Sequence, residues 1–185
     1  MKLSITLTLI ILFLIKCLES SLYFVFGGCP VMNGKSDLDI SRYVGKWFEI
    51  RRSDDIFQRN TRCSTQTYED RGSYISIQNR AIDNASGEVI STDQTATVPD
   101  NNRPDIWLVK RFPGGPAIPY LVLDSDYETY SVVVSCTDIL RLFHSISGFI
   151  LSRESTLDGK TVSRLTSLLA TNGVTYLANV TQDCG

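Results

Sequence analysis

The sequence is poor in histidine, a residue on which most catalytic triads and many metal centres depend, and it carries little net charge. It contains one histidine, His144, and its 18 Lys and Arg residues against 20 Asp and Glu residues leave a formal charge of -2. This balance argues against a nucleic acid partner and against a highly charged substrate. Because no His, Cys, Asp and Glu residues recur at the spacing of metal ligands, we expect no metal site and no cofactor.

The single histidine also limits the enzymatic chemistry that the chain could perform. A Ser-His-Asp or Cys-His arrangement would have to use His144, which lies between Phe143 and Ser145 in the expected connection before the last strand. A histidine in such a place is more often structural. We therefore expect no catalytic residue, and we expect no haem ligation by His144.

Long apolar runs are missing except at the N-terminus. Lys2 is followed by an apolar run over residues 3–15, interrupted only by Ser and Thr, which is shorter than a membrane-spanning helix. Residues 1–21 are therefore predicted to be a secretory signal peptide, cleaved near Ser21 or Leu22. Residues 22–185 are then expected to be one extracellular domain without stable membrane insertion. A membrane anchor ending at Lys16 is the alternative, because residues 22–26 prolong the apolar character.

The cysteines indicate disulfide bonds. Five are present, and four remain once Cys17 leaves with the signal peptide: Cys29, Cys63, Cys136 and Cys184. An even number of cysteines in an exported chain argues for two disulfides, which would leave no free thiol. Four cysteines allow three pairings, and the residues alone do not choose among them.

Strand-like runs separated by turn residues cover most of the chain after residue 46. We predict eight strands, at the spacing of an antiparallel all-β domain: residues 47–52, 64–69, 74–81, 88–98, 106–112, 120–123, 130–136 and 148–153. Turns are expected between them, at residues 70–73, 84–87, 99–104 and 113–116. Residues 54–62 form the longest predicted loop, which we expect to overhang an opening.

One helix is expected after the last strand, at residues 158–172. Asp158 can cap the start of this helix, and Gly173 lies at the position that a C-terminal cap occupies. Four apolar residues recur between them at helical spacing: Val162, Leu165, Leu168 and Leu169. Residues 121–123 and 132–134 are apolar on both strand faces, so something must cover their outer side. The helix is available to do so.

The stretch at residues 43–50 organises the rest of the chain. Gly45 permits a tight backbone bend, and Trp47 can fill the space that the bend closes. A Gly-x-Trp triplet alone is most often an ordinary turn before a core tryptophan. Here it follows Cys29-Pro30 and precedes eight strand-like runs, and three features lie beyond it: Asp126-Tyr127-Glu128, the run Ile150-Leu151, and Arg153.

With these features the chain resembles the lipocalins, and within them the apolipoprotein D group, which includes insect bilin-binding proteins. Further matches to the apolipoprotein D pattern are Arg62-Cys63, Pro119-Tyr120, Ser135-Cys136-Thr137 and Leu142-Phe143-His144. The resemblance implies an all-β fold, an eight-stranded antiparallel up-and-down barrel with one C-terminal α-helix packed outside. It also implies that Trp47 plugs the narrow end of the barrel under Arg153, and that the disulfides join Cys29 to Cys136 and Cys63 to Cys184.

The resemblance further implies a ligand pocket inside the barrel. It places binding-site aromatics at Tyr68 and at Phe149, where the family usually has tryptophan. Strand alternation adds four candidates, although one bulge would invert their orientation and each could equally be core: Trp107, Val109, Tyr120 and Val133. Such a pocket is largely apolar with a few hydroxyls, which suits a fatty acid, a sterol, a retinoid or a tetrapyrrole or carotenoid pigment. The sequence therefore predicts a secreted carrier of a small hydrophobic ligand.

The sequence alone leaves two other functions open. A lipocalin can act mainly through a protein surface, with a cell-surface receptor as partner, and the chain could be a monomer or a weak homo-oligomer. Some lipocalin-type barrels isomerise lipids with a cavity thiol, but two disulfides would leave no thiol for this. Asn84 and Asn179 are acceptors for N-linked glycosylation in an exported chain.

Overall fold

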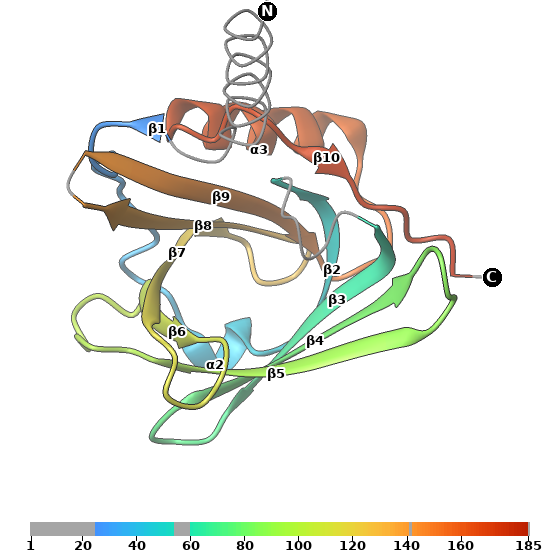
Figure 1. Cartoon of the computed structure of the whole chain (residues 1–185), viewed down its shortest axis with the longest axis horizontal. Helices are drawn as coiled ribbons and strands as arrows, with labels where there is room; N and C mark the ends of the chain where they lie inside the picture. Colours follow the sequence, from blue (N-terminus) through green and yellow to red (C-terminus); the bar gives the residue numbers. More distant parts are fainter. Residues whose placement is uncertain (1–24, 54–59, 141, 185) are drawn as a thin grey trace, which may run out of the picture.

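The computed structural model describes residues 25–53, 60–140 and 142–184, which form an eight-stranded antiparallel barrel with a helix outside (Figure 1). The barrel strands are β2 (Gly45–Arg52), β3 (Thr61–Asp70), β4 (Ile75–Asp83), β5 (Val89–Thr97), β6 (Ile106–Lys110), β7 (Ala117–Ser125), β8 (Tyr130–Ile139) and β9 (Phe143–Ser152). Each pairs with the next, and β9 also pairs with β2, so the sheet closes. Closure removes the free edges that an open sheet would expose, and the predicted fold class is confirmed.

Two short strands extend the sheet beyond the barrel. β1 (Val25–Phe26) pairs with β9, and β10 (Ala178–Asn179) pairs with β2. Neither was predicted, because a two-residue strand has no period to recognise. The predicted signal peptide at residues 1–21 lies outside the described residues.

The eight predicted strands are all present, but several extend further than expected. β9 begins at Phe143 rather than at residue 148, so His144 is a strand residue and not part of a connection. β3 begins at Thr61, so the last two residues of the predicted 54–62 loop belong to a strand, while residues 54–59 lie outside the described part. Both extensions are held by pairing with distant segments, His144 with Val25 and Thr61 with Asp83, which no local pattern reveals.

The strands β7, β8 and β9 can be apolar on both faces because both faces are buried, one in the barrel interior and the other beneath a helix. Their inward residues join the core inside the barrel: Val122, Val133 and Leu151. Their outward residues pack beneath the helix α3 (Gly159–Thr171): Leu121, Leu123, Val132, Val134 and Ile150. Leu165 and Leu169 of α3 are fully buried there, and each buried side chain of this size contributes about 1.5–3 kcal/mol.

The helix α3 begins and ends where the sequence predicts. The Asp158 side chain accepts hydrogen bonds from the backbone N–H groups of Lys160 and Thr161, which satisfies donors that a helix leaves free. The helix stops at Asn172, and Gly173 follows with φ +89°, in the left-handed region that suits glycine. Figure 1 shows α3 lying across the outside of the barrel beside β9.

One end of the barrel is sealed by Trp47 and Arg153. The chain enters through the short helix α2 (Ile40–Tyr43) and bends at Gly45, whose φ is +101°. Trp47 is fully buried, and the Arg153 guanidinium lies 3.7 Å from the centre of its ring. Arg153 also donates hydrogen bonds to five backbone carbonyls: those of Arg42, Tyr43, Val44, Lys46 and Tyr127. A single side chain thus ties three segments of the closed end together.

Two disulfides fasten the ends of the described chain to the barrel. Cys29 is joined to Cys136 in β8, and Cys63 in β3 is joined to Cys184. This is the pairing that the resemblance implied. No helix in residues 25–53, 60–140 and 142–184 is long and apolar enough to cross a membrane.

Candidate ligand-binding site

The barrel encloses a cavity of about 500 Å³ between its strands. This volume lies within the range of about 300–1,000 Å³ that small-molecule sites occupy. Much of its wall is apolar: Ile77, Ala81, Ile90, Val109, Phe112, Ile118 and Phe149, together with the rings of Tyr68 and Tyr120. Polar side chains complete it, including Asn79, Thr92, Gln94, Ser135 and Ser147. The cavity can therefore surround a hydrophobic molecule and make a few hydrogen bonds to it.

Four of the six residues predicted to contact the ligand line this cavity: Tyr68, Val109, Tyr120 and Phe149. The other two, Trp107 and Val133, also face the barrel interior but are fully buried in the core and do not line the cavity. Trp107 stacks against the ring of Tyr120 with the centroids 5.9 Å apart, and its indole N–H donates to the Pro104 carbonyl at 2.8 Å. It therefore supports a cavity residue from behind.

An aromatic cluster separates the cavity from the sealed end of the barrel. The Tyr43 ring lies 5.4 Å from that of Trp47, 5.5 Å from that of Tyr68 and 5.4 Å from that of Trp107. Such tilted and edge-to-face pairs are the arrangements that aromatic rings prefer. Large interlocked rings hold Tyr68 and Tyr120 in place, so their hydroxyls have fixed positions.

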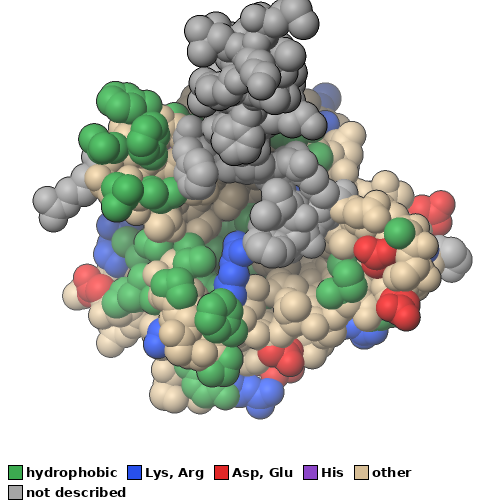
Figure 2. Space-filling model, in the orientation of Figure 1, with side chains coloured by type: hydrophobic (Ala, Val, Ile, Leu, Met, Phe, Trp, Pro, Cys, Tyr) green, Lys and Arg blue, Asp and Glu red, His purple; other side chains and the backbone are tan. Residues whose placement is uncertain are grey.

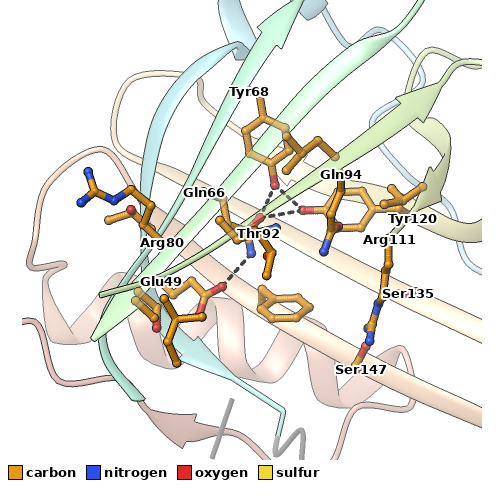
Figure 3. Close-up of a pocket in the computed structure, with 18 of the residues that line it drawn as sticks. Glu49, Gln66, Tyr68, Arg80, Thr92, Gln94, Arg111, Tyr120, Ser135 and Ser147 are labelled. Atoms are coloured by element: carbon orange, nitrogen blue, oxygen red, sulfur yellow. Dashed lines mark hydrogen bonds between the residues drawn. The ribbon is translucent and has the colours of Figure 1, made fainter. Parts of the chain in front are cut away.

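A connected set of polar side chains runs along one wall of the cavity. Glu49 in β2 forms a buried ion pair with Arg52, in which Arg52 Nη1 lies 2.8 Å from Glu49 Oε2. The Gln66 amide of β3 donates to Glu49 Oε1 at 2.7 Å, and its carbonyl oxygen accepts from the Tyr68 hydroxyl. The Tyr68 and Tyr120 hydroxyls are 2.6 Å apart. Figure 3 traces this line from Glu49 through Gln66 to the two tyrosines.

The environment keeps both tyrosines in their neutral form. Burial raises the pKa of Tyr68 and of Tyr120 well above the ordinary tyrosine value, and the negative charge of Glu49 raises both further. The two hydroxyls are therefore neutral hydrogen-bonding groups at physiological pH rather than bases. Arg52 donates in addition to Ser64 and Thr61, so the ion pair is enclosed by hydrogen bonds.

Sequence reasoning missed Glu49, Arg52 and Gln66 as interior residues. The signal for two of them was present, because Glu49 has the same strand parity as Trp47, and Gln66 the same parity as Tyr68. Charged and amide side chains are seldom buried unless they are paired, so their polarity argued for the solvent face. Only the three-dimensional contact between β2 and β3 shows that they pair with one another.

The outer part of the cavity carries positive charge. Arg80 of β4 and Arg111, just after β6, both line the cavity and are exposed. In Figure 3 they lie on opposite sides of the pocket, Arg80 beyond Glu49 and Arg111 toward Ser147. The cavity thus combines a buried polar wall with two exposed cations.

The remaining predicted residues lie away from the cavity lining. His144 is buried, and its Nδ1 lies 2.9 Å from the Gly27 carbonyl oxygen, a contact that holds β1. Asn84 and Asn179 are exposed, the former in the turn between β4 and β5 and the latter in β10. In the part of the chain that the structure describes, no three His, Cys, Asp or Glu side chains come together to hold a metal ion.

Comparison with known proteins places this fold in a family. The model of the lipocalin-like domain matches residues 38–181. Apolipoprotein D of Bos taurus is 33% identical over 153 residues, which cover 82% of this chain and 79% of the relative. None of the relatives named in this subsection carries the name of an enzyme.

Solved structures agree with the family at the level of the fold. Insecticyanin of Manduca sexta superposes with a TM-score of 0.74 at 21% identity, covering 85% of this chain and 88% of that one. Lobster apocrustacyanin A1 gives a TM-score of 0.72 at 20% identity, with 86% and 91% covered. The barrel closed by β9 and β2, the Trp47 plug under Arg153 and the match over residues 38–181 agree, and the chain belongs to the lipocalin family.

Proposed function

We propose that this protein is a secreted carrier that binds one small hydrophobic molecule inside its barrel. The observation that carries the proposal is the cavity of about 500 Å³ behind a sealed end, with a largely apolar wall. An eight-stranded barrel has an interior just wide enough to hold side chains or one small ligand. Here the side chains leave room, so the interior can hold a ligand.

Binding by burial, without reaction, suits the chemistry of the cavity. The four cysteines of the described chain are paired in disulfides, and its one histidine does not line the cavity. The interior carboxylate, Glu49, is already paired with Arg52 and Gln66. These facts favour a carrier over a lipid-isomerising enzyme.

Secretion is part of the same proposal. Disulfides persist in oxidising compartments and are rare in the cytosol. The two disulfides therefore fit an exported chain, as does the apolar run at residues 3–15. Fatty acids, sterols, retinoids and tetrapyrrole or carotenoid pigments remain the candidate ligands, because each offers a large apolar surface to such a wall.

Probe binding to matched variants tests the proposal. Gln94 lines the cavity and Thr95, its neighbour in β5, points to the other face of the sheet. With the neutral fluorescent probe N-phenylnaphthylamine, we expect one site per chain in the native protein. Gln94→Trp should lower its affinity by about tenfold or more by filling the cavity, while Thr95→Trp should leave it unchanged. Equal effects of the two variants, or no saturable binding, would count against the proposal.

A second candidate, a protein-binding surface, is favoured by one exposed apolar patch. It consists of Val25, Phe26, Leu140, Leu142 and Phe143, with Phe26 79% and Leu140 86% exposed. Figure 2 shows hydrophobic side chains gathered at the upper left, over β1 and the β8–β9 turn. Large exposed apolar patches mark interaction sites. Sedimentation velocity tests self-association there, which the double variant Phe26→Ser with Leu142→Ser should abolish.

A further inference from the structure

A row of polar side chains crosses the inner wall of the barrel. Asn79 of β4 pairs with Gln66 of β3 on one side and with Thr92 of β5 on the other. Paired positions on adjacent strands point to the same face of a sheet, so these side chains lie in one row. Gln94 lies two residues beyond Thr92 on the same face, and all four residues line the cavity. Figure 3 shows Gln66, Thr92 and Gln94 directed into the pocket.

Three members of this row are not hydrogen-bonded to the rest of the protein. The side chains of Asn79, Thr92 and Gln94 form no hydrogen bond with any residue that the structure describes. Their outward-facing neighbours differ, since Gln78 of β4 donates to Asp93 of β5 at 3.3 Å. The two inward amides and the hydroxyl are therefore available to a molecule that enters the cavity.

A ligand that enters the cavity must replace the water that these three groups bind. Each amide and each hydroxyl offers both a donor and an acceptor and carries no charge, so uncharged hydroxyl and keto groups match them. A polar group that loses its water without gaining another partner lowers the affinity about tenfold or more. An unbranched hydrocarbon chain would incur this loss along the whole row. Sites of this kind discriminate strongly against ligands that lack the matching groups.

The dimensions of the row favour a rigid ligand. Neighbouring strands lie about 4.8 Å apart, so the row from β3 to β5 extends over about 10 Å. Across the barrel the wall is mainly apolar, with Ile118 of β7 and Phe149 of β9. A fused ring system can place several polar groups along one edge of this length and keep its other edge apolar. A flexible chain would lose more conformational freedom in doing so.

We infer that the cavity selects a neutral, rigid ring compound with several hydroxyl or keto groups along one edge, a polyhydroxylated sterol, whose polar edge lies against Asn79, Thr92 and Gln94. This inference rests on the proposed carrier function and names the class of ligand that the same cavity takes. These three residues then determine specificity. A fatty acid is the contrasting case, because its one polar group would lie at the exposed Arg80 and leave the row without partners.

Displacement of N-phenylnaphthylamine by two pairs of neutral steroids tests the inference. Cortisol is compared with progesterone, which lacks its hydroxyls, and ecdysone is compared with cholesterol. A purely apolar wall prefers the less hydroxylated member of each pair, because a hydroxyl that enters without a partner loses its water. We expect the reverse order here, with the more hydroxylated member bound about tenfold or more tightly.

Variants in the row locate the preference. Asn79→Leu and Gln94→Met keep the approximate size of each side chain but remove its amide. Each should lower the affinity for cortisol about tenfold and raise the affinity for progesterone. Gln78→Leu, on the outer face of β4, is the matched control and should keep the native order. A variant that merely misfolds would lose both steroids, so the opposite changes distinguish lost recognition from lost structure.

The outcomes separate this inference from the proposed function. Tighter binding of progesterone and cholesterol by the native protein overturns the inference and leaves the carrier function standing. An order that survives both Asn79→Leu and Gln94→Met also overturns it, as does hexadecanoate that binds more tightly than either hydroxylated steroid. If the native protein binds neither the probe nor any ligand, the carrier function fails and the inference fails with it.

Discussion

Arg153 is the side chain whose removal should most damage the closed end of the barrel. Its guanidinium lies 3.7 Å from the Trp47 ring centre and donates to five backbone carbonyls at 2.9–3.1 Å. The ring contact contributes about 0.5–2 kcal/mol. Burial lowers the pKa of Arg153, so part of the gain from these contacts is offset by the loss of water around its charge.

We predict that Arg153→Met lowers the free energy of unfolding by about 3 kcal/mol. Each hydrogen bond from a charged donor contributes about 1.5–3 kcal/mol, but the five share one half-buried group and are not additive. Water can reach some of the freed carbonyls, which places the total at the low end of the 3–5 kcal/mol cost of breaking a buried charged contact. For a chain of this size the melting temperature should fall by about 6–12 °C.

Two further variants separate charge from geometry. Arg153→Lys keeps a positive charge near Trp47 but loses the planar fork that reaches several carbonyls, so it should recover about half of the lost stability. Arg71→Met is the matched control, because Arg71 and its partner Glu69 are both about half exposed. Exposed pairs of this kind contribute at most about 1 kcal/mol.

Urea unfolding followed by tryptophan fluorescence, with the disulfides kept oxidised, measures these differences. A loss for Arg153→Met no larger than that for Arg71→Met would refute the reasoning. So would full recovery in Arg153→Lys, because that would assign the whole effect to charge.

Three other predictions follow from the packing and the pKa shifts. Leu169→Ala, on the buried face of α3, should lower the free energy of unfolding by about 2–5 kcal/mol through the cavity it leaves. An equal loss from Leu142→Ala, at an exposed residue, would contradict the assigned packing. Reduction of both disulfides, which close loops of 107 and 121 residues, should cost about 4 kcal/mol or more by freeing the unfolded chain; unchanged urea midpoints after reduction would argue against this. Stability should fall above pH 10, by about 1.4 kcal/mol per pH unit for each tyrosine that ionises only on unfolding. The buried tyrosines with a raised pKa are Tyr43, Tyr68 and Tyr120. Absorbance titration at alkaline pH would contradict this prediction if all tyrosines ionised before the chain unfolded.

The sign of the alkaline effect follows from the direction of those shifts. Burial raises the pKa of each tyrosine in the folded state above the ordinary value of 10.0. The unfolded chain therefore loses these protons first as pH rises. The stability is complete below pH 10.0 and declines as pH rises toward the folded-state pKa.

Much of the fold could be predicted because its signals are local. The apolar runs at 121–123 and 132–134 indicated a sheet covered on both sides, and Leu165 and Leu169 at helical spacing supplied the cover. Asp158 marked the start of the helix through its capping oxygen. The strand ends were predicted less accurately. β9 begins before residue 148 because His144 pairs with Val25, which is far away in the sequence.

The site could be predicted only in part, because its polar wall depends on partners far apart in sequence. Tyr68 and Tyr120 were expected in the cavity and line it. Glu49 and Gln66 are 17 residues apart, and each alone would have been assigned to solvent. Trp107 has the expected orientation, yet it lies behind Tyr120, since alternation gives a residue's face but not its depth.

The central claim is that the barrel carries a hydrophobic molecule in its cavity. Native mass spectrometry of the protein, purified gently from a eukaryotic host and followed by lipid extraction, tests this most directly. We expect a co-purified hydrophobe at one molecule per chain, or an empty protein that takes up one molecule of a fatty acid, sterol, retinoid or bilin. A protein that is empty and binds no fatty acid, sterol, retinoid or bilin would contradict it.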